Sequence, residues 1–239
     1  MIMAVSSRPI LLAILVFALT ACGGQVNTDR EVAQTSQTAQ SPQSESPEQQ
    51  PAPAIDTRPA IIAFGDSISA GYGVAPGKTY PEDLQHLLDE AGYHYHVVNL
   101  GVSGDTTTDG VERLPEVLGL HPAIVILEFG GNDGLRGLPV ASARMNLAKM
   151  IEELRAANIE ILMAGMTLPR NYGPDYIKSF DQMYLDLAKE YKLARIPFLL
   201  DGVGGHPDLT QPDGIHPTAE GDRIVASTVM QYLRPLLHK

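Results

Sequence analysis

Two short segments of the sequence carry residues that could perform nucleophilic catalysis. Ser67 follows an apolar stretch and a glycine, which suits a nucleophile held on a tight turn, although serines also cap helices well. Asp213 and His216 stand three residues apart around Gly214, so one compact loop could present a general base and the carboxylate that orients it. The alternative for that loop is a surface histidine beside a helix cap.

Two further segments could supply hydrogen-bond donors to a developing oxyanion. Gly101 lies in a glycine-containing turn, where a backbone N–H can approach a ligand closely. Asn132 follows two glycines, and its side-chain amide could donate to the same charge. Either segment alone could be a plain turn, because Asn, Asp and Gly are common turn residues. Their occurrence together with Ser67 and His216 predicts the complete set of groups that acyl transfer needs.

The alternation of apolar runs with helical patterns predicts how these segments are positioned. The expected strands cover 60–64, 95–100, 123–129, 160–164 and 197–200, and the expected helices cover 80–91, 107–118, 139–157, 174–191 and 218–233. Such alternation favours an α/β fold with a central parallel sheet between helices. Ligands of these folds bind beyond the carboxyl ends of the strands, which is where the first three strands run into Ser67, Gly101 and Asn132.

The four segments, taken in order, resemble the conserved blocks of the SGNH (GDSL-type) hydrolases. The resemblance is narrower to the bacterial branch of multifunctional thioesterases, arylesterases and lysophospholipases. The matching blocks are GDSISAGY at 65–72, GVSGDT at 101–106, GGNDGLRG at 130–137 and DGIHP at 213–217. Ile68 stands where the family's name-giving leucine would be, which is an apolar exchange that removes no catalytic group. The resemblance implies a flavodoxin-like three-layer α/β/α sandwich.

The resemblance also implies an activity and a role for each residue. Ser67 would be the nucleophile, His216 the base and Asp213 its orienter, with an oxyanion hole formed by the Ser67 and Gly101 N–H groups and the Asn132 side chain. The implied enzyme is a serine esterase that cleaves carboxylic esters through an acyl-serine intermediate, without cofactor or metal. Two alternatives remain: an acyltransferase that uses the same site, and a surface lipoprotein that binds a ligand without catalysis.

In this branch the acyl pocket is bordered by the loop after the fourth strand and by the segment after Asn132. The apolar side chains expected in its wall are Leu135, Leu138, Leu168, Pro169 and Tyr172. Such a wall favours aryl esters and medium-chain acyl esters over acetylated sugars, with lysophospholipids or thioesters as further substrates.

The N-terminal region has the pattern of a lipoprotein signal. Arg8 precedes an apolar run at 10–19, which is too short to span a bilayer as a mature helix. The sequence LTAC at 19–22 resembles the bacterial lipobox, and we expect Cys22 to be lipidated after removal of residues 1–21; an ordinary cleaved signal is the alternative. Residues 22–57 are polar and proline-containing, so they are expected to form a disordered tether ahead of a hydrolase domain at 58–239.

Composition narrows the choice of compartment and partners. The 239 residues carry a formal net charge of −11, which argues against nucleic-acid binding, and the single cysteine excludes an intrachain disulfide. We expect a monomer in the bacterial cell envelope, lipid-anchored at the outer membrane and facing the periplasm. Its expected partners are a small-molecule ester or lipid substrate and, through the lipid, the membrane.

Overall fold

The computed structural model describes residues 56–239. The expected signal, Cys22 and most of the expected tether lie outside the described residues. No helix within residues 56–239 has the length and apolar character required to cross a membrane.

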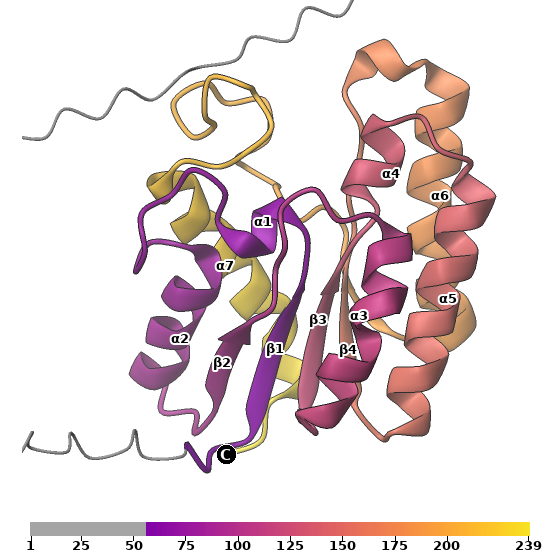
Figure 1. Ribbon diagram of the computed structural model, residues 1–239. Coiled ribbons are helices and arrows are strands. Elements are labelled where there is room, and N and C mark those ends of the chain that lie inside the picture. Colours follow the sequence, from indigo (N-terminus) through magenta and orange to yellow (C-terminus); the bar gives the residue numbers. More distant parts are fainter. Residues whose placement is uncertain (1–55) are drawn as a thin grey trace, which may run out of the picture. The chain divides into compact units, whose positions relative to one another are not determined.

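A five-stranded parallel sheet forms the centre of the described chain, in the order β2-β1-β3-β4-β5 (Figure 1). The strands are β1 (Ala60–Gly65), β2 (His96–Asn99), β3 (Ile124–Glu128), β4 (Glu160–Ala164) and β5 (Ala194–Ile196). Every residue of β1 and β3 is buried, which explains their nearly continuous apolar sequences, because both faces of these strands are covered.

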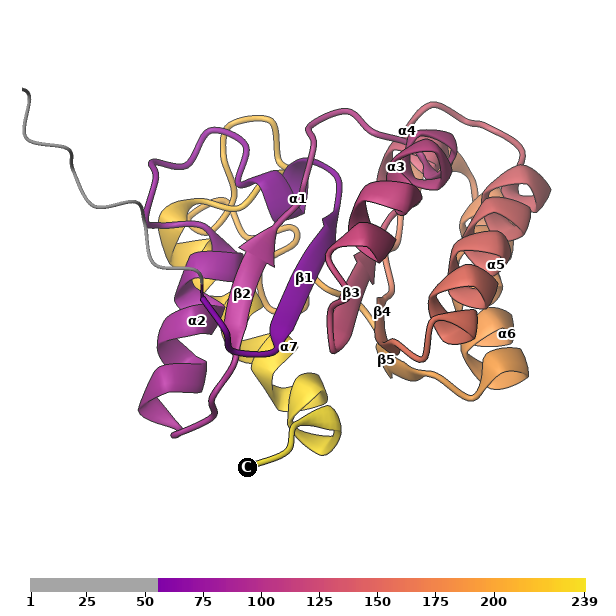
Figure 2. The ribbon, with the colours of Figure 1, turned by 60° about the horizontal axis from the view of Figure 1, so that its bottom comes forward.

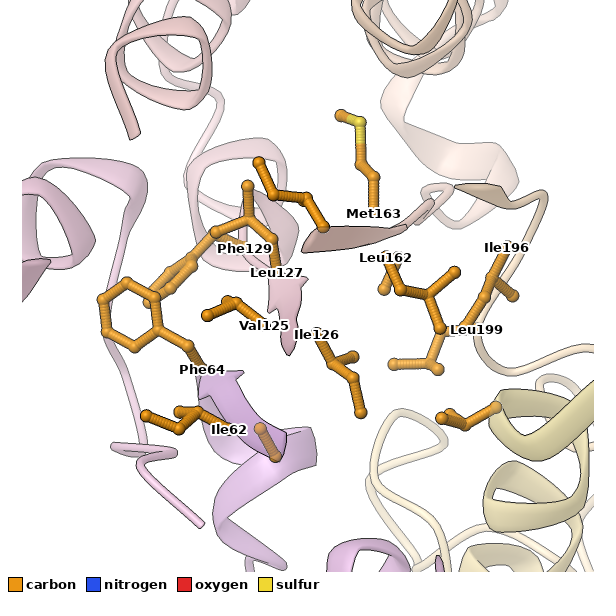
Figure 3. Close-up of a cluster of buried hydrophobic side chains, with 14 of the residues drawn as sticks. Ile62, Phe64, Val125, Ile126, Leu127, Phe129, Leu162, Met163, Ile196 and Leu199 are labelled. Atoms are coloured by element: carbon orange, nitrogen blue, oxygen red, sulfur yellow. The ribbon is translucent and has the colours of Figure 1, made fainter. Parts of the chain in front are cut away.

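Helices cover the two faces of the sheet (Figures 1 and 2). One face carries α2 (Tyr80–Glu90) and α7 (Ala219–Leu233), and the other carries α3 (Thr107–Gly119), α5 (Val140–Ala156) and α6 (Pro174–Tyr191). The predicted three-layer α/β/α architecture is confirmed. Figure 3 shows buried side chains on the two faces of the sheet: Ile126 of β3 lies beside Leu162 of β4 on one face, and Phe64 of β1 packs against Phe129 on the other.

Two of the helices that flank the site begin at capping boxes, which are recognisable in the sequence. Thr79 and Glu82 form a capping box at the start of α2, and Thr106 and Asp109 form another at the start of α3. In each box the acidic side chain accepts the N–H of the threonine, which satisfies a donor that the helix itself leaves free. The capping box of α3 fixes the end of the loop that contains Gly101.

The structure differs from the sequence prediction at the fifth strand and in two short helices. The strand is Ala194–Ile196 and not 197–200, because Pro197 has no N–H to donate and the chain turns there. Residues 197–200 contain apolar side chains because Leu199 and Leu200 are buried in the core. The short helices α1 (Ser67–Ala70) and α4 (Gly131–Leu135), which were not predicted, lie at the carboxyl ends of β1 and β3 (Figure 1).

Candidate active site

The strand order brings the expected site residues to one edge of the sheet. β1 is flanked by β2 and β3, so the connections that leave β1 and β2 pass to opposite faces of the sheet, and parallel α/β sheets bind ligands at such a point. Ser67 begins α1 directly after β1, Gly101 follows β2, and Asn132 lies in α4 after β3. His216 comes from the loop before α7 and reaches the same edge.

Ser67, His216 and Asp213 form a continuous chain of hydrogen bonds. The distance from His216 Nε2 to Ser67 Oγ is 2.8 Å, and that from His216 Nδ1 to Asp213 Oδ2 is 2.7 Å. With Nδ1 protonated toward the carboxylate, Nε2 is free to accept the serine proton. Asp213 Oδ1 in turn accepts the N–H groups of Ile215 and His216, at 2.9 and 3.0 Å, which shapes the loop around the imidazole.

The environment keeps Asp213 ionised. Partial burial acts to raise the pKa of its carboxyl group, but the hydrogen bonds from His216 and Ile215 outweigh burial and hold the pKa below its usual value. An ionised Asp213 can fix the tautomer of His216 and stabilise an imidazolium.

The three expected oxyanion donors differ in the hydrogen-bond acceptors that they have in the structure. The Gly101 N–H donates to Asn99 Oδ1 at 2.9 Å, and Asn132 Nδ2 donates to Asp66 Oδ2 at 3.1 Å and to Asp105 O at 2.9 Å. The Ser67 N–H has no protein acceptor within residues 56–239. An oxyanion would therefore replace existing acceptors at Gly101 and Asn132.

Two glycines allow the close packing around Ser67. A Cβ atom at Gly101 would lie 2.2 Å from the backbone nitrogen of Ala70, so only glycine lets the loop after β2 lie against α1. A Cβ atom at Gly65 would lie 2.2 Å from Glu128 Oε2. The buried carboxyl group of Glu128 thus requires a glycine ahead of the turn that carries Ser67.

Glu128, at the end of β3, stabilises the turn that carries Ser67 by accepting hydrogen bonds from the residues on either side of it. Its Oε2 accepts the N–H of Asp66 at 3.0 Å, the N–H of Ser69 at 3.3 Å and the Ser69 hydroxyl at 2.9 Å. Complete burial, together with the charge of Asp66, raises the pKa of Glu128 well above its usual value, and burial also raises the pKa of Asp66 to about 6. Glu128 was not among the predicted site residues, although an acidic residue at the end of an otherwise apolar strand was a signal in the sequence.

Arg113 of α3 is a second supporting residue that sequence reasoning missed. Its guanidinium group donates to Asp105 Oδ2 at 2.7 Å, to Leu100 O at 2.9 Å and to Gly65 O at 3.2 Å. It also lies over the ring of Phe64, 4.9 Å from the centroid. Arg113 therefore ties the ends of β1 and β2 to the loop before α3.

A cavity of about 430 Å³ adjoins the expected site residues. Gly131 and Ile215, the chain neighbours of Asn132 and His216, both line it, so it opens beside these two residues. Three of the expected pocket residues are in its wall, namely Leu135, Leu168 and Pro169.

The other two expected pocket residues, Leu138 and Tyr172, are not among the lining residues. Leu138 is exposed to solvent. The Tyr172 hydroxyl donates to the carbonyl oxygen of Leu135 at 2.8 Å, so Tyr172 stabilises the backbone of a residue that lines the cavity. Met166, Phe198 and Leu200 also line the cavity. They were not predicted because they lie in the segments that follow β4 and β5, outside any recognisable motif.

Comparisons with known proteins agree on one family. The model of the GDSL-like Lipase/Acylhydrolase family matches residues 63–224. Esterase TesA of Pseudomonas aeruginosa is 43% identical over 178 residues, which cover 74% of this chain and 89% of the relative. Thioesterase 1/protease 1/lysophospholipase L1 of Escherichia coli is 37% identical (78% of this chain, 88% of the relative), and an arylesterase of Vibrio mimicus is 38% identical (72% and 87%). A crystal structure of TesA, 43% identical, covers 74% of this chain and 99% of its own, with a TM-score of 0.72.

Proposed function

The chain belongs to the GDSL-like lipase/acylhydrolase family, and on that premise we propose that Ser67, His216 and Asp213 carry out its reaction. It is a serine esterase that hydrolyses carboxylic esters. The observation that supports these residue roles is the pair of hydrogen bonds of 2.8 and 2.7 Å that joins the serine hydroxyl to His216 and His216 to Asp213.

The proposed acylation step begins at the Ser67 hydroxyl. His216 Nε2 takes its proton while Oγ attacks the acyl carbonyl carbon, and the electron pair of the carbonyl moves to its oxygen. The Ser67 and Gly101 N–H groups and the Asn132 amide stabilise that charge. His216 then gives its proton to the leaving oxygen or sulfur, and the bond to the acyl carbon breaks.

Deacylation repeats the sequence with water as the nucleophile. His216 removes a proton from water, the hydroxide attacks the acyl-serine, and the same donors stabilise the second oxyanion. Collapse returns the proton to Ser67 Oγ and releases the carboxylic acid. Asp213 acts in both halves by stabilising the imidazolium form of His216.

The preferred substrates we propose are aryl esters and medium-chain acyl esters, with lysophospholipids or thioesters as further substrates. The cavity of about 430 Å³ is within the size range of small-molecule sites, and Leu135, Leu168 and Phe198 make much of its wall apolar. Relatives named as an arylesterase and as a thioesterase and lysophospholipase support this choice.

We further propose that the enzyme is a lipoprotein of the bacterial cell envelope, anchored through Cys22 at the outer membrane and facing the periplasm. The support is the lipobox-like sequence at 19–22, in which the single cysteine of the chain occupies the position that would be lipidated. A membrane location would place lysophospholipids within reach of the site.

Hydrolysis of p-nitrophenyl esters from acetyl to palmitoyl, by residues 56–239 and by the Ser67→Ala variant, tests these assignments. We expect turnover with an optimum at medium chain length, and its loss in the variant to below about 10⁻³ of the wild type. The variant should keep its stability, because Ser67 is only partly buried. Residual turnover by Ser67→Ala would refute the nucleophile, and an optimum at acetyl with activity on acetyl-xylan would refute the substrate class.

A further inference from the structure

Tyr72 is an exposed aromatic residue beside the catalytic histidine. Its side chain is exposed, with 53% of the residue's surface accessible, yet its ring centroid lies 4.6 Å from that of His216, with the two planes tilted by 41°. The other large apolar side chains exposed within residues 56–239 are aliphatic, and several of them lie on helix surfaces, as Met145 does on α5. An exposed ring in contact with the catalytic base calls for an explanation in terms of substrate.

The backbone that carries Tyr72 is fastened to the histidine loop. Gln211 Nε2 donates to the Tyr72 carbonyl oxygen at 2.6 Å and to Pro217 O at 2.9 Å, and the Gln211 N–H donates to His216 O at 2.7 Å. Gly73 makes this approach possible, because a Cβ atom there would lie 2.3 Å from Gln211 Oε1. The backbone of Tyr72 is thus fastened to the histidine loop, and its ring already lies against His216 before any ester binds.

The chemistry of acylation determines what must lie next to that ring. His216 Nε2 has to protonate the leaving oxygen, so this oxygen must come within hydrogen-bonding distance of the imidazole. In the proposed reaction the acyl chain occupies the cavity bordered by Gly131 and Ile215, and Tyr72 is not among the residues that line it. The alcohol part of the ester then lies outside that cavity but beside the imidazole, where the exposed ring of Tyr72 packs against His216.

We propose that Tyr72 is a specificity-determining residue for the leaving group and that its ring packs against the ring of aryl esters. This inference rests on the proposed roles of Ser67 and His216. Aromatic rings pack favourably at centroid separations of about 4.5–7 Å, and the gain per pair corresponds to roughly a two- to tenfold change in rate. Tyr72 would thereby favour phenols over aliphatic alcohols as leaving groups without altering the preference for the acyl chain.

Two esters that share one acid but differ in the alcohol separate the effect of Tyr72 on the leaving group from any effect on the acyl chain. Phenyl butyrate and trifluoroethyl butyrate form the same butyryl-enzyme, so deacylation is common to both, and the ratio of their kcat/KM values reports acylation alone. Tyr72→Ala should lower this ratio about fivefold. Tyr72→Phe keeps the ring and should keep the wild-type ratio, and Met145→Ala, which removes an exposed side chain on α5, should leave both values unchanged.

The outcomes that contradict the inference are distinct from failure of the proposed mechanism. An equal loss on both esters in Tyr72→Ala would mean that the residue acts only by supporting His216, and an unchanged ratio would mean that it does not contact the leaving group. Replacing butyrate by hexanoate in both esters must give the same fivefold effect, since the acyl chain lies elsewhere. Failure of the mechanism itself would appear separately, as phenyl butyrate turnover that survives in Ser67→Ala.

Discussion

At the scale of single residues, His216 and Asp213 share one hydrogen-bonded chain but make unequal contributions to it. His216 accepts and donates protons in both halves of the proposed reaction, whereas Asp213 holds one imidazole nitrogen at 2.7 Å and never exchanges a proton with substrate. Two backbone N–H groups also bind Asp213 Oδ1, so an asparagine there could keep the shape of the loop while losing the charge.

We therefore expect His216→Ala to reduce kcat by about 10⁶ and Asp213→Asn by about 10⁴, as the corresponding changes do in serine proteases. The measurement is kcat on p-nitrophenyl butyrate for both variants, with Asp208→Asn, an exposed carboxylate of the same loop region, as the control that should remain fully active. A harmless Asp213→Asn would show that another carboxylate orients His216.

The residues of the site divide into those that a sequence reveals and those that only the fold reveals. Ser67, Asn132 and His216 stand in short blocks of glycine, asparagine and proline, whose turn chemistry marks them locally. Gln211 and Arg113 stand outside these blocks, and each donates to a backbone carbonyl oxygen of a distant segment. Gln211 donates to Tyr72 O, 139 residues earlier in the chain, and Arg113 donates to Gly65 O, 48 residues earlier. No local spacing encodes such a contact.

At the scale of secondary structure, the packing of α7 against α2 contains an unpaired carboxyl group. Asp222 of α7 is 1% exposed, and neither of its oxygens has a hydrogen-bond partner within residues 56–239. Burial, followed by the charges of Asp83 and Glu82 on α2, raises the pKa of Asp222 to about 7. The folded protein therefore retains a proton between about pH 4 and pH 7 that the unfolded chain releases.

This difference in proton binding between the folded and unfolded states determines how the stability of the protein changes with pH. Because the folded state binds the extra proton, the contribution of Asp222 to stability falls as pH rises through that window, and the full penalty is present above about pH 7. Asp222→Asn should accordingly raise the free energy of unfolding by roughly 1–2 kcal/mol at about pH 8, a value reduced from the full shift because a buried, unpaired amide also costs energy.

Urea denaturation of residues 56–239 at about pH 8 and about pH 4 would measure this effect. The gain should largely disappear at the lower pH, where Asp222 is protonated in the folded wild-type protein and about half protonated in the unfolded chain. Glu220→Gln is the matched control, because Glu220 lies in the same first turn of α7 with 62% of its side chain exposed. An equal gain at both pH values would show that desolvation of the charge is not its cause.

Elements with strong local signals were predicted closely, and those governed by their neighbours were not. The helix at 174–191 was predicted with the observed bounds, because a proline at its first position and regular apolar spacing mark it. The fifth strand was misplaced by three residues, since Leu199 and Leu200 are buried in a turn, and burial alone does not distinguish a strand from a packed loop. Helix α1 has only four residues and depends on contacts with Glu128 and Asp66, so no periodicity could indicate it.

At the scale of the whole molecule, one sheet edge collects groups from across the described chain. Ser67 and His216 are 149 residues apart in sequence, and the loops after β1, β2 and β3 and before α7 meet there because parallel strands place all their carboxyl ends on one side. Every residue assigned to the proposed mechanism lies within residues 56–239. Catalysis and attachment to a membrane are therefore expected to be separable.

Cys22→Ser in the full-length chain tests that separation. The serine cannot accept a thioether-linked lipid, and each methylene of a lost acyl chain removes about 0.8 kcal/mol of membrane affinity. We expect the variant to lose incorporation of labelled palmitate and to move from the membrane fraction to the soluble fraction. Its kcat and KM on p-nitrophenyl butyrate should equal those of residues 56–239, because no catalytic group is altered. A variant that remained in the membrane fraction would refute the anchor, whereas a soluble but inactive variant would refute the independence of the catalytic domain and show that the N-terminal segment contributes to the site.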